Sequence, residues 1–167
     1  MVLVLCCAIG GTLAWLTDKT ASVTNTFTVG DINIELKETT TNYKMVPGNT
    51  ITKDPKVTVQ ANSEACWLFV KVEESANFDS FMTYAMADGW TALPGVTGVY
   101  YREVAATTAA TDFSVLKDNS VLVKDSVTKA MLNGLSETTF PTLTFTAYAV
   151  QKDNVNSAAD AWAKANA

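Results

Sequence analysis

The sequence contains no histidine, and this absence excludes several kinds of active site. Without an imidazole, the chain cannot form a Ser/His/Asp or Cys/His catalytic group, an HExxH zinc site or a histidine-based pH switch. Basic residues are also few, with 12 Lys and Arg against 17 Asp and Glu and a net charge of -5. Because no basic cluster is available to neutralise phosphates, we expect no nucleic-acid partner.

Cysteine is scarce as well. Cys6 and Cys7 lie in the apolar start of the chain, and Cys66 is the only other cysteine. One remaining thiol can form neither an internal disulfide nor a cysteine-rich metal site. Because Cys66 lies in the apolar run ACWLFV, we interpret it as a buried and inert thiol rather than a reactive one.

The carboxylates show no catalytic pattern. Glu73 and Glu74 are neighbours in a predicted strand, so they point to opposite faces and cannot share a site. Asp112, Asp118 and Asp125 are spaced too loosely for an EF-hand, although an isolated calcium site there stays open as an alternative. We therefore expect no enzyme activity, no catalytic residue and no cofactor.

Charge is absent from the first sixteen residues. The run Met1–Ile9 is too short to span a membrane but has the length of a signal-peptide core. Thr12 and Ala14 are small residues at positions −3 and −1 of an A-x-A-like pattern, which predicts cleavage between Ala14 and Trp15. No Lys or Arg precedes the run, so either the natural chain begins upstream of Met1 or it has been trimmed. The alternative is a buried N-terminal strand or helix of the fold.

We therefore expect residues 1–14 to be the remnant of an export signal. Residues 15–167 then form one domain, a length that suits a single hydrophobic core. This division predicts a secreted protein, located in an extracellular matrix or at the cell surface.

Short strand patterns dominate this domain. Ile32, Ile34 and Leu36 alternate with polar residues, and Pro47-Gly48 is a strong turn signal. The run ACWLFVKVEE is apolar on both faces, which indicates a central strand that is covered twice. FPTLTFTAYAVQ alternates with Leu143, Phe145, Ala147 and Ala149 on one face, which predicts a strand with one buried face.

Helical patterns are few. Apolar spacing in FDSFMTYAMADGW predicts a short helix that ends at Gly89. Ser157 and Asp160 have capping-box spacing, which predicts a C-terminal helix with Trp162 sealing the core. The fold class that follows is all-β with minor helices, as a jelly-roll-like antiparallel β-sandwich with a short C-terminal helix.

Several stretches, in order, resemble the TasA and camelysin (CalY) family of bacterial proteins, which are exported with a SipW-type signal peptidase. They are the small-residue stretch 10–14, the segment Trp15-Leu16-Thr17-Asp18 and the strand Phe27-Thr28-Val29-Gly30. The turn Pro47-Gly48 followed by Lys53-Asp54-Pro55-Lys56-Val57, the strand WLFVKVEE and the closing AYAVQ with its Ala-Trp helix complete the likeness.

The resemblance implies a structural subunit of extracellular biofilm fibres, assembled by donor-strand complementation. In that mechanism an N-terminal segment leaves its own subunit and adds as a strand to the next one. The donor here would be about residues 15–25, with Trp15, Leu16 and Val23 as anchors. The partners would be further copies in a filament, other matrix proteins and a signal peptidase during export.

Two other functions bear on this sequence. Some members of the family are called metalloproteases, but a chain without histidine does not carry a histidine zinc site, so that activity is not transferred. The alternative function is a monomeric secreted or cell-surface binding module, such as an adhesin or carbohydrate binder. Exposed Trp67, Trp90, Tyr100 and Tyr101 would favour it, because aromatic rings stack on sugars; core packing is the competing interpretation of these rings.

Overall fold

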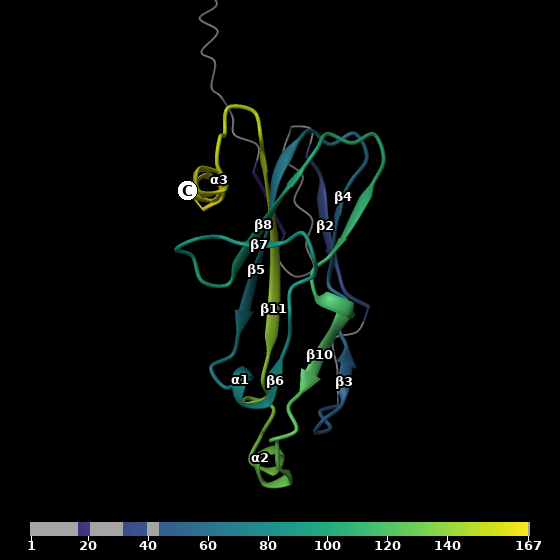
Figure 1. Ribbon diagram of the computed structural model, residues 1–167, viewed down its shortest axis with the longest axis vertical. Coiled ribbons are helices and arrows are strands. Elements are labelled where there is room, and N and C mark those ends of the chain that lie inside the picture. Colours follow the sequence, from purple (N-terminus) through teal and green to yellow (C-terminus); the bar gives the residue numbers. More distant parts are fainter. Residues whose placement is uncertain (1–16, 21–31, 40–43, 167) are drawn as a thin grey trace, which may run out of the picture.

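The computed structural model describes residues 17–20, 32–39 and 44–166 of the chain (Figure 1). The strands in these segments form three sheets, and every strand pair in them is antiparallel. The largest sheet has the order β1-β11-β5-β8-β7, and the smaller sheets have the orders β2-β4-β9 and β3-β10-β6. The antiparallel β-sandwich with a short C-terminal helix is therefore confirmed.

The strands of the five-stranded sheet are β1 (Thr17–Thr20), β5 (Cys66–Glu74), β7 (Thr91–Ala92), β8 (Val99–Val104) and β11 (Leu143–Gln151). The smaller sheets comprise β2 (Ile34–Lys37), β4 (Lys56–Val59) and β9 (Thr111–Ser114), and β3 (Thr50–Thr52), β6 (Met82–Thr83) and β10 (Ser120–Val123). Short helical segments are α1 (Phe78–Phe81), η1 (Lys117–Asn119), α2 (Lys129–Asn133) and α3 (Ala158–Ala165).

The main core lies between the five-stranded sheet and the two smaller sheets. Alternate residues of β5 and β11 meet valines of β4 and β10 there, including Val70, Ala147, Val57 and Val123, which are all fully buried. Ile34 of β2 joins this core, as the alternation around it predicts. Burial of these side chains is the main source of stability of the sandwich.

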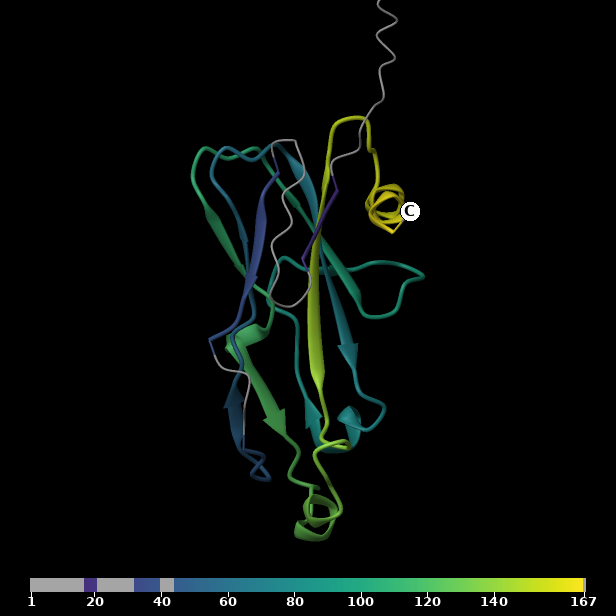
Figure 2. The ribbon, with the colours of Figure 1, turned by 180° about the vertical axis from the view of Figure 1, so that it is seen from behind.

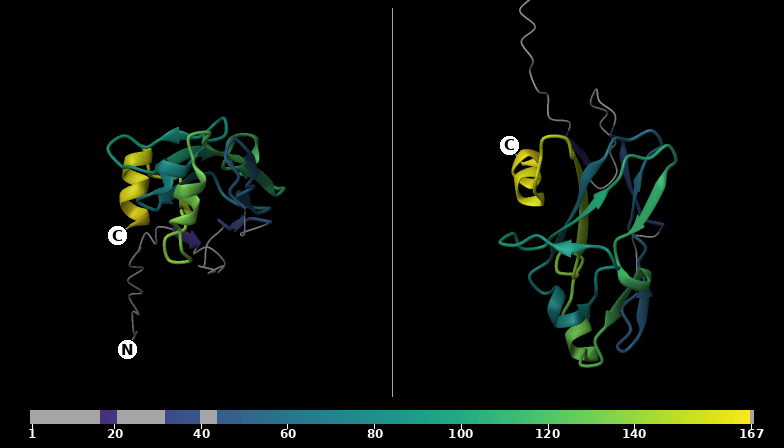
Figure 3. Two further views of the ribbon diagram at one scale, coloured as in Figure 1. Left: turned by 90° about the horizontal axis from the view of Figure 1, so that it is seen from below. Right: turned by 45° about the horizontal axis from the view of Figure 1, so that its top comes forward.

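A second core covers the opposite face of the same sheet. Trp67 and Phe69 of β5 and Tyr148 of β11 pack there beneath α3, and Trp162 of α3 closes the cluster. Figure 3 shows α3 on the outer side of the sheet, away from the smaller sheets. The expectation that β5 is covered on both faces is thus confirmed.

Two expectations about elements need correction. The helix predicted to run to Gly89 ends at Phe81, because Met82 is extended and pairs with Val123 as part of β6. The face of β11 predicted to be polar is covered at one end, since Tyr148 is only 4% exposed beneath Trp162. In both cases tertiary contacts determine the outcome, and these are not visible in local spacing.

The Pro47-Gly48 turn precedes β3. Gly48 has a φ of +76°, its N–H donates to the carbonyl of Val123, and Asn49 donates back to Val46. A residue with a side chain is strained at such a positive φ, so glycine suits this turn.

Candidate functional site

The described part of the N-terminal segment forms the outermost strand of the largest sheet. β1 pairs with β11 in an antiparallel register that sets Asp18 opposite Ala149 and Thr20 opposite Ala147. Figure 2 shows β1, in purple, alongside the long yellow-green β11. Residues 17–20 belong to the predicted donor segment, and here they pair with a strand of their own chain.

β11 is much longer than the partner that borders it on this side. Its opposite edge pairs with β5 from Leu143 to Gln151, whereas β1 pairs only with Ala147–Val150. Within the described ranges, the part from Leu143 to Thr146 has no strand partner on the β1 side. Unpaired N–H and C=O groups along a strand are the feature that an incoming strand can use.

The C-terminal helix lies next to this edge. α3 packs against β11 and β5 and also contacts β1. Its first turn is fixed by Ser157, whose Oγ accepts from the N–H of Asp160 at 3.1 Å and donates to the Asp160 carboxylate at 2.7 Å. The predicted capping pair is therefore present, and it satisfies one of the free N–H groups of the helix.

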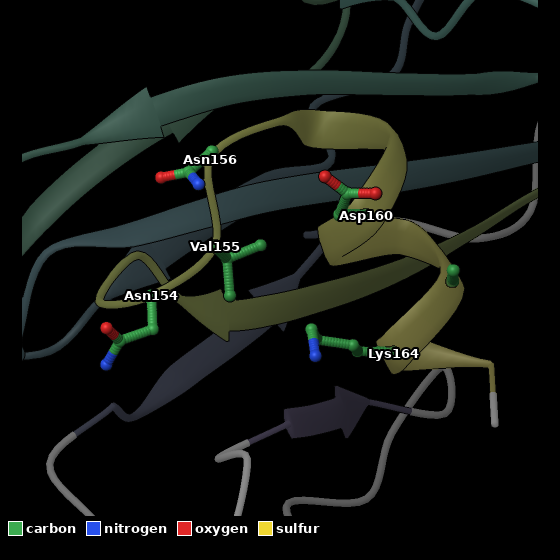
Figure 4. A pocket seen from close by; sticks show the side chains of 6 residues that line it. Asn154, Val155, Asn156, Asp160 and Lys164 are labelled. Carbon is green, nitrogen blue, oxygen red and sulfur yellow. The ribbon is translucent and has the colours of Figure 1, made fainter.

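A shallow hollow of about 360 Å³ lies between α3 and the loop before it (Figure 4). Asp160 and Lys164 line it from the helix, and residues Asn154, Val155 and Asn156 line it from the loop. The Asp160 carboxylate already accepts from Ser157, so this group is partly satisfied within the cap. The ionisable groups that line the hollow are one carboxylate, Asp160, and one amine, Lys164.

The predicted cleavage residues Ala14 and Trp15 and the predicted anchors Trp15, Leu16 and Val23 lie outside the described residues. Within the described part of the chain, no helix has both the length and the apolar character needed to cross a membrane.

Several acidic residues form hydrogen bonds or ion pairs with neighbouring side chains at the protein surface. Asp112 accepts from Lys56 at 2.8 Å and from Thr58 at 2.7 Å, and the bond from Lys56 lowers its pKa. Glu73 pairs with Lys71, and Glu74 accepts from Tyr84 at 2.7 Å. No group of three His, Cys, Asp or Glu side chains able to hold a metal forms among residues 17–20, 32–39 and 44–166.

Cys66 is completely buried in the main core. Burial raises the pKa of its thiol to about 12, because the thiolate would lose its hydration there. The thiol is therefore protonated at neutral pH and is a packing group.

The aromatic residues considered for sugar binding are mostly internal. Trp67 is 5% exposed and donates its indole N–H to the carbonyl of Val155, and Trp90 is 9% exposed and donates to Ser114. Tyr100 and Tyr101 are half-buried against the two cores. These four residues do not form an exposed row, since they lie on both sides of the sheet.

One residue with an unusual environment was not selected from the sequence. Arg102 of β8 lies between the rings of Phe113 and Trp90, with its guanidinium carbon 4.2 Å and 5.3 Å from the two ring centres. Its Nε is buried and has no hydrogen-bond partner. The signal in the sequence was that Arg102 is the only arginine of the chain and lies within a strand.

Comparison of the chain with family models, with curated proteins and with solved structures finds no match. The β-sandwich defines a fold class that supports many functions. The function must therefore be argued from the site itself.

Proposed function

We propose that this chain is a secreted structural protein whose copies join into extracellular fibres of a bacterial biofilm matrix by exchange of the N-terminal strand. The observation that carries the proposal is the position of β1, which is a four-residue strand at the end of the five-stranded sheet. A terminal strand at a sheet edge can be replaced by the same strand from another copy without changing the rest of the fold.

The energetics favour such an exchange. Four cross-strand residue pairs hold β1 on β11, whereas nine such pairs join β11 to β5. Each cross-strand pair contributes roughly 0.2–1 kcal/mol, so leaving β11 costs little compared with opening the centre of the sheet. The same β11 register is available to an incoming copy, and head-to-tail contacts of this kind extend into filaments.

The biological context comes from the resemblance to the TasA and camelysin family, which we propose as the family of this chain. It supplies the matrix location, export by a signal peptidase with cleavage after Ala14, and Trp15, Leu16 and Val23 as donor anchors. We also propose that the protein is not an enzyme, which agrees with the protonated state of Cys66 and with the neighbour-bound carboxylates.

Negative-stain electron microscopy tests assembly directly. We compare the protein beginning at Trp15 with a version that lacks residues 15–25. Fibres from the first and none from the second support strand exchange. Single dispersed particles from both contradict self-assembly, and the monomeric binding module then becomes the function to test, by glycan screening.

A reversible lock tests the route of assembly. The double variant Asp18→Cys/Ala149→Cys introduces thiols at positions that face each other across β1 and β11. Oxidised to an intrachain disulfide, it should stay monomeric, and after reduction it should form fibres. Asp18→Cys alone is the control and should assemble in both conditions. Equal fibre formation by the oxidised double variant would exclude exchange of β1.

A further inference from the structure

Arg102 is the only arginine of the chain and occupies a position built around its side chain. In the β5–β8 register Arg102 lies opposite Leu68, a fully buried residue of the main core. Its guanidinium therefore lies between the sheets, in contact with the ring of Phe113 on β9 and near that of Trp90. Aromatic faces attract a cation, and arginine stacks on them with its planar group.

The segment that carries Trp90 is fixed by hydrogen bonds to β9 and the residue that follows it. Trp90 donates its indole N–H to the carbonyl of Ser114 at 2.8 Å, and Ala87 donates to Val115 at 2.9 Å. Between these two residues, Gly89 has a φ of +88°, and a Cβ there would lie 2.7 Å from Nη2 of Arg102. The turn thus follows the guanidinium closely, and the side chain is held in place before any ligand arrives.

The guanidinium has no counter-charge among the described residues. No ion pair joins Arg102 to any described carboxylate, although Lys56, Lys71 and Lys152 each have one. Its Nε is enclosed without an acceptor, while part of the residue remains exposed. Burial lowers the pKa of Arg102, as expected for a cation that has lost water and gained no anion. This is unusual in a protein with an excess of acidic residues.

Arg102 lies toward the side of the sandwich that is remote from β1. β9 is the outermost strand of its sheet, and β8 is bordered on this side only by the two-residue β7. Because part of Arg102 remains exposed, an approaching group can reach this residue between the rims of two sheets.

We propose that Arg102 binds a carboxylate, which its guanidinium takes in the bidentate manner that the planar fork favours. Trp90 and Phe113 orient the fork, and Gly89 gives it room. The carboxylate comes either from an acidic side chain of a second copy or from a small free acid. This inference uses neither β1 nor the fibre proposal, and it can be tested on the monomer.

The single arginine allows a direct test by NMR. In ¹⁵N-labelled protein beginning at Trp15, the only arginine Nε–H signal belongs to Arg102. We titrate sodium acetate at mildly acidic pH and compare sodium chloride at equal ionic strength. A saturable shift with acetate and none with chloride supports the proposal. Equal responses to the two salts, or no response to either, would overturn it.

Variants separate recognition by the fork from simple attraction by charge. The indole N–H signal of Trp90 provides a second readout in proteins without Arg102. The acetate response should be lost in Arg102→Gln and weakened about tenfold in Arg102→Lys, which keeps the charge without the fork. Lys152→Gln is the matched control, because Lys152 also lies over a ring, that of Trp67, but already pairs with Glu103. If Arg102→Gln does not fold, the titration of the unmodified protein still decides.

Dilution identifies the source of the carboxylate. If a second copy supplies it, the Arg102 Nε–H shift changes with protein concentration, and acetate dissociates the associated species in sedimentation. If the shift is independent of protein concentration while acetate still binds, the carboxylate belongs to a small acid. Either result supports carboxylate binding and leaves the fibre proposal to its own test.

Discussion

Cys66 illustrates how far a single position can be understood from its neighbours in the sequence. Its apolar flanks predicted burial, and the structure places it in the main core with its thiol pKa raised to about 12. Arg102 is the opposite case, because the alternation of VYYREV assigns no face to it. Only the pairing of β8 with β5, and the approach of Trp90 and Phe113, reveal its environment.

The raised pKa of Cys66 predicts a stability change in alkaline solution. The unfolded thiol loses its proton near its ordinary pKa of 9.0, but the native thiol keeps it up to about pH 12. Unfolding therefore releases a proton between these values, so stability should fall with pH there, by up to about 1.4 kcal/mol per pH unit.

Urea unfolding across this pH range measures the effect. Tyr84 is half-buried and also has a raised pKa, so the control is Cys66→Ala, in which only the cysteine contribution disappears. Parallel curves for the two proteins would contradict a protonated native thiol.

Two glycines allow backbone strain to be separated from steric contact. Gly98 and Gly95 both have positive φ, at +74° and +79°. A Cβ at Gly98 would lie 2.5 Å from the carbonyl oxygen of Val72. A Cβ at Gly95 would have no described atom within 4 Å, apart from those of its chain neighbours. Gly95→Ala should cost about 1 kcal/mol of unfolding free energy from strain alone.

Gly98→Ala should cost more than this, by about 1–2 kcal/mol, because the loop must also move away from β5. Chemical denaturation of the two variants is the measurement. Equal losses would mean that the contact with Val72 is relieved without cost.

At the scale of elements, α3 was predicted in detail, because a capping pair and an apolar stripe are local signals. α1 was predicted too long, because Met82, which continues the apolar spacing, is extended and pairs with Val123 of β10 instead. The partners of β11 were not predictable, since β1 and β5 are both far away from it in the sequence. Register of this kind depends on long-range packing and not on local preference.

The packing of α3 on the sheet can be tested at Trp162. Its ring lies 5.3 Å from that of Phe69 and 5.0 Å from that of Tyr148. Because the side chain is half-buried, Trp162→Ala should lower the unfolding free energy by about 2 kcal/mol. Phe140→Ala removes an aromatic ring that is 48% exposed and should cost much less. Similar losses in the two variants would show that α3 adds little to the fold.

At the scale of the whole molecule, the two cores predict that the sandwich folds without its N-terminal strand. Among the side chains that the structure describes, the main core is built from elements that follow residue 31, and the second core chiefly from β5, β8, β11 and α3. Removal of residues 15–25 should therefore keep the β-sheet circular dichroism and a cooperative transition. The unfolding free energy should fall by only about 1–3 kcal/mol, from the lost pairs with β11.

Circular dichroism and urea unfolding of the shortened protein measure this. Loss of cooperativity would mean that β1 is an integral part of the core. It would also mean that missing fibres in the shortened protein reflect misfolding.

The unequal numbers of residue pairs along the two edges of β11 predict different rates of local opening. Local opening of a native protein is frequent where few pairs must break and rare where many break together. Backbone amides of β5 that face β11 should exchange with deuterated water only when the whole domain unfolds, whereas those at the β1 edge should exchange through brief separations of four pairs. Local opening is thus slow at the centre of the sheet and fast at its β1 edge. We expect β1 to separate from β11 and pair with it again many times before the domain unfolds once.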